Sequence, residues 1–198
     1  MKYICQLDYP EIPYITRTSM EGAQWEAGQK TTIKTSGCGL CASIMAADRL
    51  LPNCEFSLED AIALSYGSGA NCLPGTYWEI YIPAFAEKMG LTYKYSNDPE
   101  ELLDCLRTGG VAMCITNGDR DGYVGVFTHG KHYITLIGQE RDGRIAILDP
   151  SYKEGKYEEE GRQGKVEMKN GVIALCDMQV LMEETEGRKV RFFLLWRK

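Results

Sequence analysis

Apolar and polar positions change their spacing about halfway along the chain. In the first half the apolar residues recur at helical spacing, which predicts helices over residues 38–51, 57–66, 76–89 and 98–109, and one short strand over 91–95. In the second half the apolar runs are short and continuous. They predict strands over 111–116, 131–138, 144–148, 172–175 and 190–196, with a short helix over 178–184. This order indicates an α+β fold, with an N-terminal helical half packed on a C-terminal antiparallel sheet.

Turn and cap residues set the limits of these elements. Pro52 ends the first helix, Ser57 and Asp60 form a capping box at the second, and Pro83 predicts a kink or a late start in the third. We expect a single domain that spans residues 1–198. Residues 1–30 have no regular pattern, and we expect them to form an arm packed on the rest of this domain. The charged run 151–170 predicts a solvated loop.

Composition narrows the class of protein. The 198 residues carry a formal net charge of −6, from 22 basic and 28 acidic side chains, and no basic cluster favours nucleic acid as a partner. No apolar run is long enough to span a bilayer, and the N-terminus lacks the apolar core of a signal peptide. We therefore expect a cytoplasmic protein as the sequence stands, or a secreted one if a leader has been removed. The eight cysteines are expected to be free thiols.

Cys38 lies where a polar run ending in Gly37 meets the first predicted helix. A helix N-terminus carries unpaired N–H groups and the positive end of the helix dipole, and both favour a thiolate. Because the thiolate is the nucleophilic form of cysteine, Cys38 is a candidate nucleophile. The alternative is a small buried thiol without a chemical role, as free cysteines commonly are.

A cysteine nucleophile needs a base, and the base needs a group that orients it. Only two histidines are present. His132 opens an expected strand, whereas His129 lies in the loop before it, and the more rigid position favours His132 as the base. Asp149 ends the next expected strand. In a hairpin of these two strands Asp149 adjoins His132 and could accept a hydrogen bond that fixes the imidazole tautomer.

Three spaced motifs connect these candidates: residues 32–39 (TIKTSGCG), residues 130–138 (GKHYITLIG) and the Asp-Pro pair at 149–150. Together they resemble the papain-like cysteine peptidases related to the bacteriocin-processing, double-glycine-leader peptidases. The similarity spans roughly residues 12–150 and includes the segments Thr76-Tyr77-Trp78 and Phe127-Thr128. It implies a papain-like fold and a peptide or protein substrate. It also implies roles for Cys38 as nucleophile, His132 as general base and acid, and Asp149 as orienting residue.

The sequence departs from that family at two places. Leu40-Cys41-Ala42 stands where the family usually has Pro-Thr-Ser, a change that concerns packing more than chemistry. The family also tends to carry a glutamine after an N-terminal Pro-Tyr segment, whereas Pro13-Tyr14 here leads to Arg17. Papain-like enzymes hold the oxyanion with such a glutamine and with the N–H of the nucleophile. Gln24 and Gln29 are the candidates for that role.

Four alternatives stay open. Cys38 and Cys41 form a C-x-x-C pair at a helix start, as in thioredoxin-like thiol-disulfide oxidoreductases, although residues 29–34 are too polar for the buried strand those proteins place before it. Cys38, Cys41, His129 and His132 have the ligand types of a zinc site. A catalytically inactive peptide-binding module, or an acyl transferase, would keep the same residues. We expect a cysteine peptidase-like hydrolase that uses no metal or cofactor; the oligomeric state is not predicted.

Overall fold

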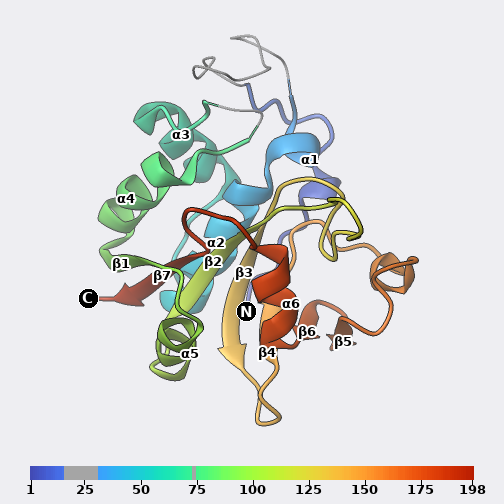
Figure 1. The fold of residues 1–198 in the computed structure, drawn as a ribbon. Coiled ribbons are helices and arrows are strands. Elements are labelled where there is room, and N and C mark those ends of the chain that lie inside the picture. The colour runs from blue at the N-terminus through green and yellow to red at the C-terminus, as the bar shows by residue number, and fades with distance from the viewer. Residues whose placement is uncertain (16–30, 73–74) are drawn as a thin grey trace.

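A seven-stranded antiparallel sheet forms the middle of the molecule, and helices cover both of its faces (Figure 1). The computed structural model describes residues 1–15, 31–72 and 75–198. The strands are β1 (Leu91–Ser96), β2 (Val111–Thr116), β3 (His132–Gln139), β4 (Ile145–Leu148), β5 (Glu167–Lys169), β6 (Ile173–Cys176) and β7 (Phe192–Arg197). They lie in the order β1-β7-β2-β3-β4-β6-β5, and each neighbouring pair is antiparallel.

The helices of the described residues follow the predicted ones closely. They are α1 (Ile33–Ser36), α2 (Cys38–Leu50), α3 (Leu58–Ser68), α4 (Trp78–Met89), α5 (Pro99–Arg107) and α6 (Met178–Glu184), with the 3-10 turns η1 (Gln6–Asp8) and η2 (Lys156–Glu158). Ser57 and Asp60 form the predicted capping box at the start of α3. The helix α4 begins at Trp78 instead of Thr76 and contains Pro83 in its interior.

Side-chain alternation along the strands explains why the sheet is covered on both faces. In β2, Val111 and Met113 join the cluster formed by α2, α3 and α4, whereas Ala112 and Cys114 join the cluster formed with α5 and α6. Because both faces are buried, the strands read as continuous apolar runs in the sequence. The prediction of a mixed α and β fold with an antiparallel sheet is confirmed, although helices lie on both faces and not on one.

One helix, α2, is buried almost all round, because it lies between the sheet and the other N-terminal helices. Each residue from 39 to 47 is buried. The hydroxyl of Thr135 on β3 donates to the carbonyl of Ala42 at 2.9 Å, which fixes the distance between helix and strand. This contact connects the element that begins with Cys38 to the strand that begins with His132.

Most charged side chains of residues 151–170 are exposed or half-buried, as predicted for a solvated loop, but part of the segment is folded and buried. The segment contains η2 and β5, and its side chains Lys156, Tyr157 and Arg162 are buried. Its two buried charged groups have partners inside the fold: Lys156 binds Asp149, and Arg162 binds Glu159 and the carbonyl of Gly125.

The N-terminal arm is described only up to residue 15. Tyr14 is buried and its hydroxyl bonds to Ser65 and Thr76, so this part of the arm packs on the body as predicted. Trp25 and the rest of residues 16–30 lie outside the described residues. None of the helices in the described part of the chain combines the length and hydrophobicity needed to cross a membrane.

Candidate active site

Cys38 is the first residue of α2, and a tight junction with α1 places it there. Gly37 caps both helices, and its N–H donates to the carbonyl of Ile33 at 2.8 Å. A Cβ at position 37 would lie 2.6 Å from that carbonyl oxygen, so the junction has room only for glycine. The first N–H groups of α2 have no partner within the helix, and the half-buried Cys38 stands at this end of α2. The geometry thus provides the helix-start environment that favours a thiolate.

His132 is the first residue of β3 and lies next to the thiol. Its side chain is buried, and its interaction with the thiol lowers the pKa of Cys38 and raises that of His132. Pairing with Thr116 on β2 fixes the start of the strand. Nε2 of the ring lies 2.7 Å from Oδ1 of Asp149, which leaves Nδ1 for the sulfur. The imidazole therefore bridges the thiol and the carboxylate.

Asp149 follows β4 directly, as the predicted hairpin with β3 requires. The carboxylate is only 1% exposed, and five donors surround it. Oδ1 accepts from His132 Nε2 (2.7 Å), the Ser151 N–H (2.8 Å) and the Ser151 hydroxyl (3.1 Å). Oδ2 accepts from Lys156 Nζ (2.5 Å) and the Tyr157 hydroxyl (2.7 Å). So many bonds hold the carboxylate ionised and fixed in orientation.

The electrostatics of the three groups favour a thiolate beside an imidazolium. Burial raises the pKa of the Cys38 thiol, but the hydrogen bond and charge of His132, with N–H groups of Tyr133 and Gly39, outweigh it and leave the pKa below its ordinary value. Burial lowers the pKa of His132, but the charge and hydrogen bond of Asp149, together with the interactions of Cys38, outweigh burial and leave the pKa above its ordinary value. Burial alone would raise the pKa of Asp149, yet Lys156 and His132 hold it far below its usual range. The arrangement can thus supply a nucleophile and a proton donor together.

Three residues around Asp149 were missed by the sequence analysis: Ser151, Lys156 and Tyr157. They lie in the segment that was predicted to be a solvated loop. The signal that could have marked it is the presence of Tyr152 and Tyr157 in an otherwise charged run, because large aromatic side chains are seldom left in water. The two rings stack at 5.8 Å between centroids and cover this side of the site.

The segment Thr76-Tyr77-Trp78, part of the sequence resemblance, packs against the start of α2. The ring of Trp78 stacks on Tyr133, which follows the histidine, with centroids 3.8 Å apart. The hydroxyl of Tyr133 donates to the carbonyl of Thr76 at 3.1 Å. A Cβ on Gly39 would lie 2.6 Å from Trp78 Nε1, so this glycine is needed for the close approach.

The described residues contain one candidate hydrogen-bond donor for an oxyanion. The N–H of Cys38 has no acceptor within α2 and is one candidate. Gln24 and Gln29, the glutamines singled out from the sequence, lie outside the described residues. Gln6 is buried near the site, but its side-chain amide already donates to the carbonyl of Lys34 at 2.7 Å. That bond holds the N-terminal segment against α1.

Two residues of the alternative sites are in surroundings unlike those of Cys38. His129 is exposed, and its Nδ1 pairs with Asp119 at 2.9 Å. Cys41 is fully buried in α2, and burial raises its pKa well above the ordinary value for a thiol. Within the described residues, no group of three or more His, Cys, Asp or Glu side chains is arranged to hold a metal ion. All eight cysteines are free.

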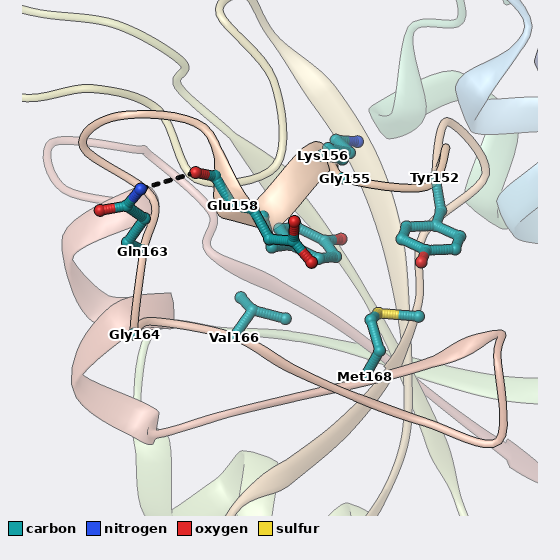
Figure 2. Close-up of a pocket in the computed structure, with 9 residues that line it drawn as sticks. Tyr152, Gly155, Lys156, Glu158, Gln163, Gly164, Val166 and Met168 are labelled. Atoms are coloured by element: carbon teal, nitrogen blue, oxygen red, sulfur yellow. Dashed lines mark hydrogen bonds between the residues drawn. The ribbon is translucent and has the colours of Figure 1, made fainter.

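A cavity of about 350 Å³ opens beside η2. Tyr152, Tyr157, Val166 and Met168 line it, and Figure 2 shows the side chain of Lys156 leaving the ribbon away from Val166 and Met168. Gln163 donates to the carbonyl of Glu158 at 2.8 Å and closes one edge. Lys156 and Tyr157, which bind Asp149, are thus also part of the lining of this cavity.

Comparisons with known proteins do not assign this chain to a family. No protein-family model matches the sequence, and a search of curated proteins gives no significant match.

Proposed function

We propose that this chain is a cysteine peptidase-like hydrolase with a papain-like fold, and that it cleaves a peptide or amide bond through Cys38, His132 and Asp149. One observation carries the proposal. A thiol at a helix start interacts with a buried imidazole, whose Nε2 lies 2.7 Å from a buried carboxylate. The motifs that resemble papain-like peptidases contain the same three residues, which adds independent support from the sequence.

In the proposed mechanism the Cys38 thiolate attacks the carbonyl carbon of the scissile bond, and the Cys38 N–H stabilises the resulting oxyanion. The imidazolium of His132 gives its proton to the leaving nitrogen as the C–N bond breaks, and a thioester remains on the sulfur. Neutral His132 then takes a proton from water, whose oxygen attacks the thioester. Cleavage of the C–S bond restores the thiolate and the imidazolium. Asp149 keeps the ring in the required tautomer throughout.

The oxidoreductase alternative has less support. A resolving cysteine must become a thiolate and reach its partner. Cys41 is fully buried with a raised pKa, and both properties work against that chemistry.

Labelling with peptide electrophiles tests the proposed function. A set of peptidyl vinyl sulfones should add once, at Cys38, as located by mass spectrometry of the digested protein. His132→Ala should lower the labelling rate about 10²–10⁴-fold, the usual contribution of a general acid–base. His129→Ala is the matched control and should label at nearly the wild-type rate, because that ring is exposed and pairs with Asp119.

Two results would contradict the proposal: labelling of another cysteine in preference to Cys38, or equal losses in the two histidine variants. A protein that labels at Cys38 but releases no cleaved peptide would be a binding module on this scaffold. Products formed in ¹⁸O-enriched water separate hydrolysis, which incorporates the heavy oxygen, from acyl transfer to another acceptor.

A further inference from the structure

We propose that Lys156 is a positioning residue of the candidate active site, which fixes the Asp149 carboxylate and offsets its charge toward His132. The proposal deepens the proposed function, since it concerns the same three residues. It was not reachable from the sequence, where Lys156 lies in a run of charged side chains.

The lysine is held as firmly as the carboxylate. Its side chain is 4% exposed, and Nζ donates to Asp149 Oδ2 at 2.5 Å, to the Ser151 hydroxyl at 2.7 Å and to the Ser151 carbonyl at 3.2 Å. An ammonium group has three hydrogens, so every one has an acceptor. Burial lowers the pKa of Lys156, but the charge of Asp149 and these hydrogen bonds favour the ammonium form, which is held in place and is not a solvated surface group.

The two oxygens of the Asp149 carboxylate bind different cations. Oδ1 faces His132, and Oδ2 faces Lys156. Without Lys156, the full negative charge of a buried Asp149 would act on the imidazole alone and would strengthen its hold on the proton. With Lys156 in place, Asp149 orients the ring while its charge is partly compensated, so His132 can release the proton that the proposed mechanism requires.

Other ionisable groups face this pair from several elements. They are Cys38 across the ring, Tyr157 on Oδ2, Tyr3 on the Asp149 carbonyl, and Arg162 and Glu159 beyond Lys156. Arg162 and Glu159 pair with each other at 2.6 Å, so their charges largely cancel. Among the described residues, Lys156 and His132 are the cations bonded directly to the Asp149 carboxylate.

Imidazole NMR titration tests the proposal, because the chain has only two histidines. In Lys156→Met the titration midpoint of His132 should rise by about one pH unit, the size of effect expected from an uncompensated neighbouring charge. Lys153→Met removes the same charge from an exposed side chain of the same segment and should leave the His132 midpoint unchanged. An unshifted His132 in folded Lys156→Met would overturn the proposal.

A second comparison covers the case in which Lys156→Met does not fold. Asp149→Asn leaves the ammonium unpaired near His132, whereas Asp149→Asn combined with Lys156→Met removes both charges. The His132 midpoint should be lower in the single variant than in the double one. Equal His132 midpoints in the two variants would show that the charge of Lys156 does not affect the imidazole. That result is expected if Lys156 has only a structural role, and it would overturn the proposal.

These titrations use no substrate, so they fail or succeed separately from the proposed function. If His132 shifts as expected but Cys38 takes no peptide electrophile, the peptidase proposal fails and the role of Lys156 stands. If Cys38 labels but His132 does not shift, the peptidase proposal stands and the role of Lys156 fails.

Discussion

Two glycines flank Cys38, and each is required by the space around it. Gly37 allows α1 to run directly into α2, and Gly39 allows Trp78 to lie against the first turn of α2. A glycine inside a helix costs roughly 0.5–1 kcal/mol relative to alanine, so its presence in α2 needs a reason. The close approach of the indole, which also stacks on Tyr133, is that reason.

Gly39→Ala should therefore destabilise the protein, although alanine is the better helix former. Overpacking of this kind costs about 1–3 kcal/mol, which exceeds the gain in helix propensity. Urea unfolding measures the change. Gly67→Ala is the matched control in α3, where an added Cβ meets nothing within 4 Å, and it should be neutral or slightly stabilising. Equal stability changes in the two variants would contradict the packing argument.

At this scale the sequence predicted the three residues that the structure brings together, Cys38, His132 and Asp149. It could do so because their positions at a helix start, a strand start and a strand end follow from local patterns. Lys156 could not be predicted in the same way. Its burial depends on a tertiary partner, and no local pattern distinguishes a lysine that will find one from a lysine in water.

Among the elements, α6 holds the loop 117–131 that precedes His132. Buried Glu184 accepts from the N–H of Val126 at 3.0 Å through its side chain and from the N–H of Asn117 at 2.8 Å through its carbonyl. Arg120 donates to the carbonyl of Glu183 at 2.8 Å. The end of α6 thus sets the path of the chain into β3.

Burial of Glu184 should make stability depend on pH. Burial raises its pKa, so the folded protein holds this proton to higher pH than the unfolded chain does. Stability is therefore lost as pH rises from the ordinary glutamate value to the raised one. Glu184→Gln removes this loss while keeping an acceptor for Val126.

Chemical unfolding at several pH values tests this. Glu184→Gln should match the wild type near pH 4 and exceed its free energy of unfolding by about 1 kcal/mol near pH 8. Glu186 is an exposed carboxylate just beyond the same helix. The variant Glu186→Gln therefore controls for the change in net charge. If Glu184→Gln were less stable than the wild type near pH 8, the ionised carboxylate would be needed for stability, and the prediction would be wrong.

The elements themselves were largely predictable, and the exception has a physical cause. Strands buried on both faces and helices with clear caps leave periodic patterns, and their ends were found within about two residues. The segment 151–169 has no such pattern, because its fold rests on polar contacts such as that of Arg162 with Gly125 at 2.8 Å. A pattern of apolar residues cannot report contacts of that kind.

In the whole molecule, the N-terminal residues connect the nucleophile side of the site to the carboxylate side. The backbone N–H of Gln6 donates to the carbonyl of Pro150 at 2.7 Å, while its side-chain amide binds Lys34 just before the nucleophile helix. The hydroxyl of Tyr3 donates to the carbonyl of Asp149 at 2.7 Å. In two of these three hydrogen bonds, Gln6 with Pro150 and Tyr3 with Asp149, the partners are more than a hundred residues apart in the sequence. The arrangement therefore follows from the topology of the fold and not from local sequence.

His132 keeps Cys38 ionised in the proposed mechanism, and every later step requires that thiolate. The direct test is the rate at which iodoacetamide alkylates each cysteine between pH 5 and 9, followed by mass spectrometry in the wild type and in His132→Ala. Cys38 should react fastest of the eight near neutral pH, ahead of the similarly half-buried Cys54, because its pKa is lowered. In His132→Ala the same reaction should require higher pH. A Cys38 that reacts no faster than Cys54, or whose pH profile is unchanged without His132, would contradict the account.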